Sequence, residues 1–426
     1  MASIDGLSLV EGPSTAISGT LPDVACKVVV VEPLARSTGH QTWFACNLVR
    51  SLTEAGSSPA LITFDGMHED VDLELRERGC DVRRVSSSFP GWIRWIVGKI
   101  TGIELGTTAA PSVVRWSFQM YLYNQMATTL SVLYASRTSY EATPILHFLC
   151  PPLWITLRCF TIARRSGVRA VITAFDTLAR FRGSSNVVPK LCRDRILSIV
   201  VQTDALRADW VSQVSPETVR VIPLPSANRA RKCDAKDSRR LLGMPDGKPI
   251  LAVIGNISPR KGYIELFHAV RGLPRNFRIL LAGDTGVWTS PDPADIAQEA
   301  GWLADTIIRR KFVPEQLMPS LFSAIDAVAL LYREPNASSG ILCLCQQYGV
   351  PVIATRFGEI GTKVRSENLG LTVDPNDSTE VAEAVRRIFT MANEPGRKDG
   401  SGAGERFSWE DVAAAHLRLY SDVRNK

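Results

Sequence analysis

The feature that most constrains the fold is a pair of short apolar runs, each of which begins an alternation of strands and helices. The first run, KVVVV, covers residues 27–31, and the second, PILAVI, covers residues 249–254. Continuous aliphatic runs of this length are typical of parallel strands that are buried on both faces. Turn residues and segments of helical composition separate each run from the next one. The pattern predicts an α/β fold with two doubly wound, Rossmann-like domains.

Each half of the chain continues this alternation. In the first half we expect further strands at 60–64, 81–85, 145–149, 169–174, 197–201 and 219–223, and helices at 41–54, 71–78, 153–165 and 205–213. In the second half we expect strands at 278–282, 307–312, 327–331, 352–354 and 370–373, and helices at 262–270, 315–324, 341–348, 379–390 and 407–420. Residues 356–361 are expected to form a turn-rich exit from a strand.

The length of 426 residues exceeds what one ordinary core organises, so two domains are expected. Residues 1–23 lack the apolar region of a signal peptide and are predicted to form a disordered tail. The expected division continues with an N-terminal domain at 24–227, a linker at 228–240, a C-terminal domain at 241–405 and a last helical segment at 406–426.

Composition excludes several classes of function. The net charge of +6 is too small for a nucleic-acid-binding chain but suits an anionic ligand or an anionic membrane face. Nine cysteines without a C-x-x-C pair, and five widely spaced histidines, indicate reduced thiols and no metal site. No apolar run is long enough for a membrane span. These features predict a cytoplasmic protein that binds no nucleic acid and needs no metal cofactor.

Residues 89–134 depart from the α/β rhythm, because they interleave tryptophans, tyrosines and aliphatic residues with a few cations. One interpretation is a surface that contacts the inner face of a membrane, with aromatic side chains against lipid and cations against phosphates. The alternative is a long helix that packs in the domain core or covers an acceptor cleft.

A serine- and glycine-rich turn at 336–340 precedes the helix expected at 341–348. Ser338 and Ser339 are good N-cap residues, and Gly340 allows a sharp turn into Ile341. The free N–H groups and the positive dipole end of such a helix can bind an anion. The alternative is an ordinary capped helix that binds nothing.

A second candidate anion site lies in the sequence GNISPRKG at 255–262. Arg260 and Lys261 follow a strand and precede a helix, a position that suits a diphosphate. Gly255 and Asn256 begin the same loop. The alternative is that both cations are solvated surface residues.

The first half offers polar residues at strand ends, where ligands of doubly wound sheets bind. Gly39 and His40 lie in the loop after the first strand. This loop is either a small-residue turn that lets a substrate approach the first helix or an ordinary strand-to-helix connection. His147, Asp176 and Arg180 lie at or beyond the ends of two later strands, and we expect them to face the same cleft edge. A lone histidine at such a position is also common as a structural residue.

Taken together, the motifs resemble the GT-B retaining glycosyltransferases of family 4, described as glycosyl transferases group 1. The resemblance is specific from 255 to about 388, is looser over 27–225, and includes a last helix that crosses back to the N-terminal domain. The residues that carry it are GNISPRKG at 255–262, AGD at 282–284, SSG at 338–340, YGVPVIATRFGEIG at 348–361, LGLTVDPNDSTEVAEAV at 369–385 and FSWEDVAAAHLRLY at 407–420.

The resemblance implies a sugar transfer with retention of configuration. A nucleotide-sugar donor would bind mainly to the C-terminal domain, a glycan or lipid-linked acceptor would bind to the N-terminal domain, and no metal is obligatory. Lys261 matches the lysine that contacts the donor diphosphate, and Gly39 and His40 match a glycine-rich loop of the N-terminal domain. The loop from Ser338 to Ile341 would hold phosphate oxygens.

The chain departs from the family pattern at the residues that bind sugar and ribose. The two glutamates of the usual E-x7-E motif fall on Asn336 and Leu344, and leucine cannot accept a ribose hydrogen bond. A further glutamate that is common in the family falls on Thr362. The usual arginine of the first loop falls on Asn256, and one histidine of an H-x-H pair falls on Leu149.

These departures leave several functions open. An active enzyme would stabilise the leaving diphosphate with Lys261 and Arg260, while His147 and Asp176 position the acceptor or the sugar. The alternatives are a catalytically inactive GT-B subunit that binds nucleotide-sugar or a partner enzyme, a nucleotide-sugar epimerase, and a membrane-surface scaffold.

Overall fold

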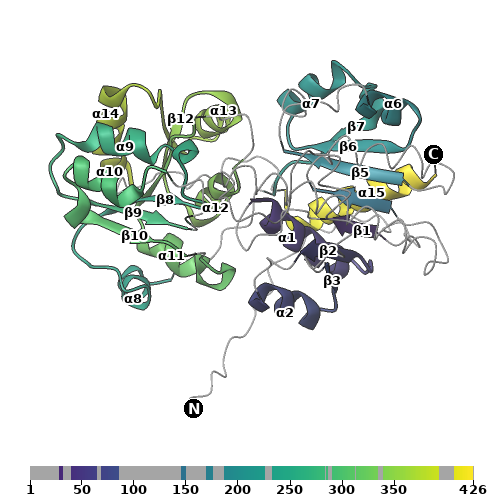
Figure 1. Cartoon of the computed structure of the whole chain (residues 1–426), viewed down its shortest axis with the longest axis horizontal. Helices are drawn as coiled ribbons and strands as arrows, with labels where there is room; N and C mark the ends of the chain where they lie inside the picture. The colour runs from purple at the N-terminus through teal and green to yellow at the C-terminus, as the bar shows by residue number, and fades with distance from the viewer. Residues whose placement is uncertain are drawn as a thin grey trace, which may run out of the picture.

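The computed structural model describes residues 28–31, 40–64, 69–85, 145–149, 169–175, 187–225, 233–283, 285, 290–311, 313–333, 339–392 and 407–425. They form two lobes, each built around one parallel sheet (Figure 1). The predicted tail at 1–23, the aromatic segment at 89–134 and the helix expected at 153–165 lie outside the described residues.

The first sheet has seven strands in the order β3-β2-β1-β4-β5-β6-β7, and its recorded strand pairs are all parallel. Its strands are β1 (Val28–Val31), β2 (Ala60–Phe64), β3 (Asp81–Val85), β4 (Ile145–Phe148), β5 (Arg169–Ala174), β6 (Leu197–Val201) and β7 (Val219–Val221). The helices described in this half are α1 (His40–Glu54), α2 (Glu69–Glu77), α6 (Val187–Arg193) and α7 (Asp204–Val211), with a short 3-10 helix η3 (Pro216–Thr218).

The second sheet has six strands in the order β10-β9-β8-β11-β12-β13, again parallel. Its strands are β8 (Ile250–Ile254), β9 (Arg278–Ala282), β10 (Thr306–Arg309), β11 (Ala327–Leu330), β12 (Val352–Thr355) and β13 (Gly370–Val373). The α-helices of this half are α8 (Ala235–Leu241), α9 (Tyr263–Val270), α10 (Pro293–Glu299), α11 (Met318–Ala324), α12 (Gly340–Tyr348), α13 (Gly358–Ser366) and α14 (Ser378–Ala392). The described residues of this half also form the 3-10 helices η4 (Pro259–Lys261), η5 (Leu303–Asp305) and η6 (Glu315–Leu317).

The prediction of two doubly wound α/β sheets is therefore confirmed. Strand order reverses between β1 and β4 in the first sheet and between β8 and β11 in the second. In open parallel sheets the crevice at such a switch point, beyond the carboxyl ends of the strands, is where ligands bind. A ligand-binding site is therefore expected at one of these two switch points.

The last helix, α15 (Trp409–Arg424), packs on the first lobe although it follows the second lobe in the chain (Figure 1, yellow). Its buried residues, among them Leu417 and Tyr420, share one hydrophobic core with Phe44 of α1. The Trp409 ring meets the Trp43 ring edge-on at 5.3 Å between centroids. A capping box on Ser408 fixes the start of the helix.

Several segments differ from expectation. Gly358–Ser366 forms α13 where a turn-rich exit was predicted, because Ile360 and Val364 bury one helical face in the second core. Helices α6 and α10 were not predicted. Residues 235–240, expected in the linker, belong to α8, and Arg239 of α8 binds the Ala324 carbonyl at 2.9 Å and so joins α8 to the second domain.

Two buried histidines connect α15 to the first sheet. His147 of β4 places its Nδ1 2.7 Å from Tyr420 Oη and its Nε2 2.7 Å from Thr173 Oγ1. His416 of α15 donates from Nδ1 to the Val412 carbonyl at 2.8 Å, and its ring centroid lies 5.3 Å from that of His147. Burial lowers the pKa of His416 to about 4, and burial together with His416 holds the pKa of His147 well below its usual value.

We therefore expect stability to fall as the pH decreases from 7 to 5. Both histidines are neutral in the folded protein but protonate near pH 6.5 when unfolded, so the unfolded state binds more protons below that pH. For His416 alone the loss at pH 5 is about 2 kcal/mol. Urea unfolding at pH 7 and pH 5 measures it. His416→Phe should lose less unfolding free energy between pH 7 and pH 5 than wild type does. His268→Gln, a change at an exposed position, should lose as much as wild type. Equal losses in all three proteins would contradict the assignment.

Candidate functional site

Three polar side chains meet at the switch point of the second sheet. Lys261, at the end of η4, donates from Nζ to Tyr332 Oη at 2.6 Å. Tyr332 Oη lies 3.3 Å from Ser339 Oγ, to which its O–H can donate. Lys261 comes from the loop after β8, Tyr332 follows β11, and Ser339 begins α12. We call these three residues the Lys261 cluster.

Glycines allow the backbones beneath this cluster to approach one another. Gly262 has φ +75, and a Cβ there would lie 2.1 Å from the carbonyl oxygen of Leu331. A Cβ on Gly283 would lie 1.8 Å from the carbonyl oxygen of Gly255, which itself has φ +106. The loops after β8, β9 and β11 therefore pack backbone against backbone, which only glycine permits.

No carboxylate among the described residues forms an ion pair with Lys261, so its positive charge is not neutralised by one of them. Its ammonium lies 4.2 Å from the centre of the Tyr332 ring, a cation–π contact, in addition to the hydrogen bond to the phenol. Arg260 beside it is exposed, and its carbonyl oxygen accepts from Arg333 N at 3.2 Å. The loop thus presents two cations that have no carboxylate partner among the described residues, as an anion site requires.

Ser339 is the N-cap residue of α12, as the sequence indicated. Its side chain is 7% exposed and accepts from Leu342 N at 3.3 Å. Gly340 begins the helix, and Gly349 ends it with φ +60. Because Ser339 contacts Tyr332, which in turn contacts Lys261, the positive end of the α12 dipole lies next to these two residues. Ile341 is partly buried against the core of the second domain.

The other predicted site residues are either at exposed or helical positions or outside the described residues. Asn256 is exposed after β8, and His40 is the first residue of α1. Gly39, Asp176, Arg180, Asn336 and Ser338 lie outside the described residues. Sequence reasoning missed Tyr332, although its position just after a buried strand and before the serine-rich turn was a usable signal.

His147 does not lie at an open cleft edge, where the sequence placed it. It is fully buried, and each ring nitrogen has a hydroxyl partner. Its partners come from α15 and β5, so both ring nitrogens are already bonded within the first domain. The prediction failed because Tyr420 is distant in the sequence.

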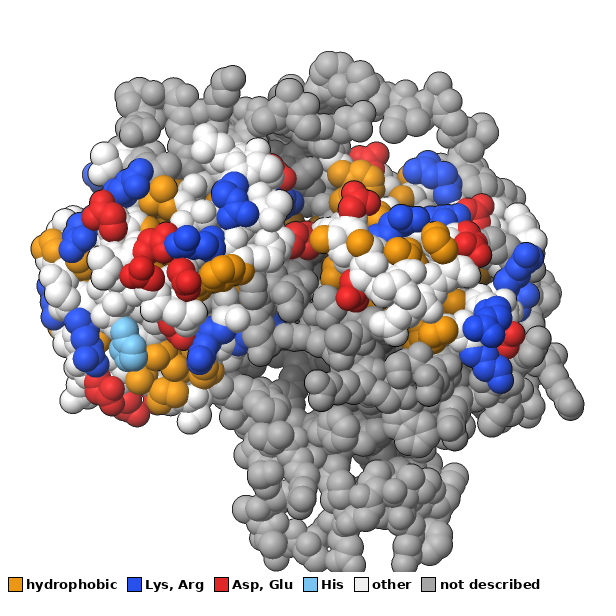
Figure 2. Space-filling model, turned by 90° about the horizontal axis from the view of Figure 1, so that it is seen from above, with side chains coloured by type: hydrophobic (Ala, Val, Ile, Leu, Met, Phe, Trp, Pro, Cys, Tyr) orange, Lys and Arg blue, Asp and Glu red, His pale blue; other side chains and the backbone are white. Residues whose placement is uncertain are grey.

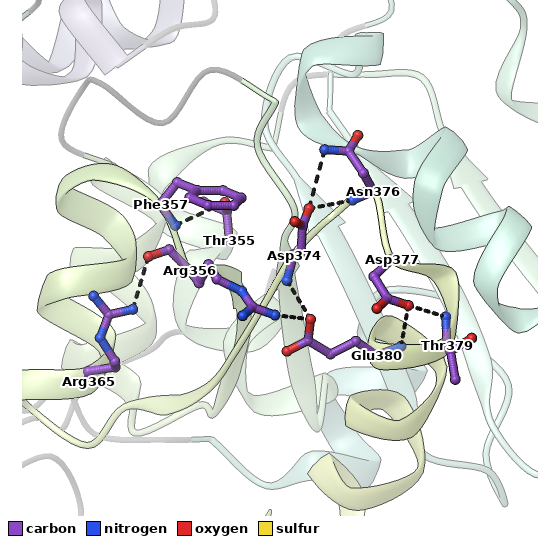
Figure 3. Close-up of polar contacts among 9 residues, drawn as sticks. All are labelled: Thr355, Arg356, Phe357, Arg365, Asp374, Asn376, Asp377, Thr379 and Glu380. Carbon is purple, nitrogen blue, oxygen red and sulfur yellow. Dashed lines mark hydrogen bonds and ion pairs between the residues drawn. The ribbon is translucent and has the colours of Figure 1, made fainter.

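The loops after β12 and β13 are braced by a polar network at the same edge of the sheet (Figure 3). Glu380 of α14 pairs with Arg356 and accepts from Asp374 N at 3.0 Å. Arg365 donates to the Arg356 carbonyl at 2.9 Å. Asp377 caps α14 through the amide of Thr379, at 3.0 Å. Through Arg365, this network ties α13 to the loop after β12.

The described residues on the face of the molecule drawn in Figure 2 form no patch of a single charge. On the face in Figure 2, acidic and basic side chains are interspersed over both lobes. Within the described residues, no group of three or more His, Cys, Asp and Glu side chains could hold a metal ion. In the same part of the chain, no helix is both long and apolar enough to cross a membrane.

Comparison with known proteins gives the family. The model of the family "Glycosyl transferases group 1" matches residues 248–391. A D-inositol 3-phosphate glycosyltransferase of Saccharomonospora viridis is 31% identical over 305 residues, which cover 63% of this chain and 68% of that protein. A protein of the same name from Acidothermus cellulolyticus is 28% identical over 221 residues, 49% of each chain. The chain thus spans about half the length of the latter relative.

Solved structures share the arrangement of both lobes. Sucrose-phosphate synthase of Thermosynechococcus elongatus superimposes with a TM-score of 0.68 at 16% identity, covering 93% of this chain and 99% of that chain. HepE of Anabaena, in complex with UDP and glucose, superimposes with a TM-score of 0.67 at 14% identity over the same shares. These similarities confirm the predicted GT-B fold.

We predict that the close packing at Gly262 makes it intolerant of any side chain. Gly262→Ala should destabilise the protein by about 3 kcal/mol or more, because it combines an unfavourable φ with a backbone clash. Gly247→Ala is the matched control, because Gly247 has φ +91 but nothing within 4 Å of a Cβ, and it should lose about 1–2 kcal/mol. Urea unfolding measures both; equal losses would show that the approach to Leu331 does not matter.

Proposed function

The chain belongs to the glycosyl transferases group 1 family, and from this premise we propose that it transfers a sugar from a nucleotide-sugar donor to a glycan or lipid-linked acceptor with retention of configuration. The observation that carries the proposal is the Lys261 cluster, which lies where the strand order of the second sheet reverses. A nucleotide diphosphate is the ligand that its chemistry suits best.

The electrostatics of the cluster suit departure of a diphosphate. Negative charge develops on the leaving phosphate as the bond to the sugar breaks, and fixed positive groups lower the energy of that state. Lys261 supplies a full charge, and the start of α12 supplies a partial one. Arg260 is exposed beside them and can reach the same anion. The phenol of Tyr332 fixes the position of the lysine, so little reorganisation is needed.

The comparisons suggest which substrates to test first. HepE was solved with UDP and glucose, so we propose a UDP-sugar as the first donor to examine. The curated relatives are named for D-inositol 3-phosphate, which makes a phosphorylated polyol a useful acceptor probe beside glycans and lipid-linked acceptors.

We propose that the reaction needs no metal and takes place in the cytoplasm, in contact with the inner face of a membrane through 89–134.

A second function is favoured by one specific observation. Leu344, at the position where the family has a glutamate for the donor ribose, is partly buried against the hydrophobic core of the second domain. A leucine there removes a polar contact to the donor. The competing proposal is a catalytically inactive GT-B subunit that binds nucleotide-sugar or a partner enzyme.

We expect Lys261→Ala to weaken nucleotide binding at least tenfold, because the diphosphate loses its nearest fixed cation. Thermal-shift titration with UDP, GDP and ADP and their common sugar conjugates measures this, since a ligand that binds the folded state raises the melting temperature. Lys236→Ala, at an exposed position on α8, is the control and should bind as wild type does. Undiminished binding by Lys261→Ala would place the anion elsewhere.

We further expect wild-type protein to form product with the anomeric configuration of the donor. Proton NMR of the first product formed from the donor that binds reports this configuration directly. Product of inverted configuration would refute retention but not transfer. Binding of donor without any product, across the acceptor panel, would support the inactive subunit.

A further inference from the structure

A small cavity lies between the two domains and borders the Lys261 cluster, with which it shares Ser339. Its volume is about 60 Å³. The first domain contributes Gln202, just after β6, and Leu224 of the segment that follows β7. The second contributes Ser339 and Cys343 of α12 and Lys363 of α13. The cavity is therefore formed only where both lobes meet.

Gln202 in this cavity is unusual, because its side-chain amide is buried without a partner. The residue is 3% exposed, and neither Oε1 nor Nε2 has a hydrogen-bond partner among the described residues. Buried amides of folded proteins are nearly always paired. Leaving one unpaired costs about 1–3 kcal/mol. Such a cost is expected where a ligand supplies the missing hydrogen bonds.

The chemistry of the cavity indicates what this ligand group is. An amide offers both a donor and an acceptor, which complements a hydroxyl group, since a hydroxyl also donates and accepts. Ser339, Glu359 and Lys363 border the same space. The Lys363 ammonium lies 3.9 Å from the Glu367 carboxylate, which with Glu359 partly balances its charge. A volume of about 60 Å³ accommodates a few water molecules or one polar substituent of a larger ligand.

Ser339 connects this cavity to the proposed diphosphate site, because its hydroxyl lies 3.3 Å from Tyr332. The group attached to the diphosphate of a sugar nucleotide is the sugar itself. We propose that Gln202 binds a hydroxyl group of the donor sugar and thereby helps to determine which sugar is accepted. This inference rests on the proposed function, because it needs a nucleotide-sugar at the Lys261 cluster.

Gln202→Met is the variant that tests the inference. Methionine has the same unbranched length but no amide, so it preserves packing and removes an unpaired polar group. The melting temperature of the ligand-free variant should therefore equal or exceed that of wild type. Gln213→Met, at an exposed position after α7, is the matched control and should bind every ligand as wild type does.

The measurement is calorimetric titration with UDP and UDP-glucose, GDP and GDP-mannose, and ADP and ADP-glucose. For the pair that wild type binds best, Gln202→Met should lose about tenfold in affinity for the sugar nucleotide and none for the parent nucleotide. An equal loss for both ligands would overturn the inference, because Gln202 would then act on the nucleotide. Unchanged affinity for both would also overturn it and would mean that water fills the cavity.

Failure of the proposed function gives a different result from failure of this inference. If wild type binds none of the six ligands, the nucleotide-sugar proposal falls and the inference falls with it. If wild type binds a sugar nucleotide more tightly than its parent nucleotide and Gln202→Met does so equally, only the inference falls.

Discussion

The approach of three backbone segments at the carboxyl edge of the second sheet is the constraint on which the candidate site depends. Gly262 lies against Leu331 and Gly283 against Gly255, at separations that exclude any Cβ. Because these loops are drawn together, Lys261 reaches Tyr332, and Tyr332 reaches the capping serine of α12. The ammonium of Lys261 is therefore positioned by backbone packing rather than by a carboxylate partner among the described residues. It stays available for an anionic ligand.

The first domain is organised by a different interaction, the packing of α15 against α1. The buried ring of His147 lies between Thr173 and Tyr420 and so joins the sheet to this last helix. Both residues that face the imidazole carry hydroxyls, which can donate or accept and so suit a neutral ring. The residue that sequence reasoning assigned to the acceptor cleft instead holds together the core of the domain that would form one wall of that cleft.

Local patterns in the sequence were sufficient to predict most of the fold. Apolar runs such as 27–31 and 249–254 identified the central strands, and Ser339 and Gly349 identified both ends of α12, because those signals act within a few residues. Features that depend on distant partners could not be predicted. His147 and Tyr420 are 273 positions apart. The roles of Tyr332 and Gln202 depend on loops that meet only after both domains have folded. Helix α13 was missed because its glycine, Gly361, suggests a turn but in fact allows close contact with the Arg356 carbonyl.

The position of α15 also has a consequence for synthesis on the ribosome. The first domain is translated first, yet Phe44 and its neighbours lack their packing partners on α15 until residues 409–424 have emerged. The core of the second domain does not depend on residues that are translated after it, since its clusters consist of residues 242–388. The domain that is translated first is thus the one whose core is completed last. For much of its synthesis the chain therefore carries an incomplete N-terminal domain with an exposed apolar face. Chaperones bind surfaces of this kind.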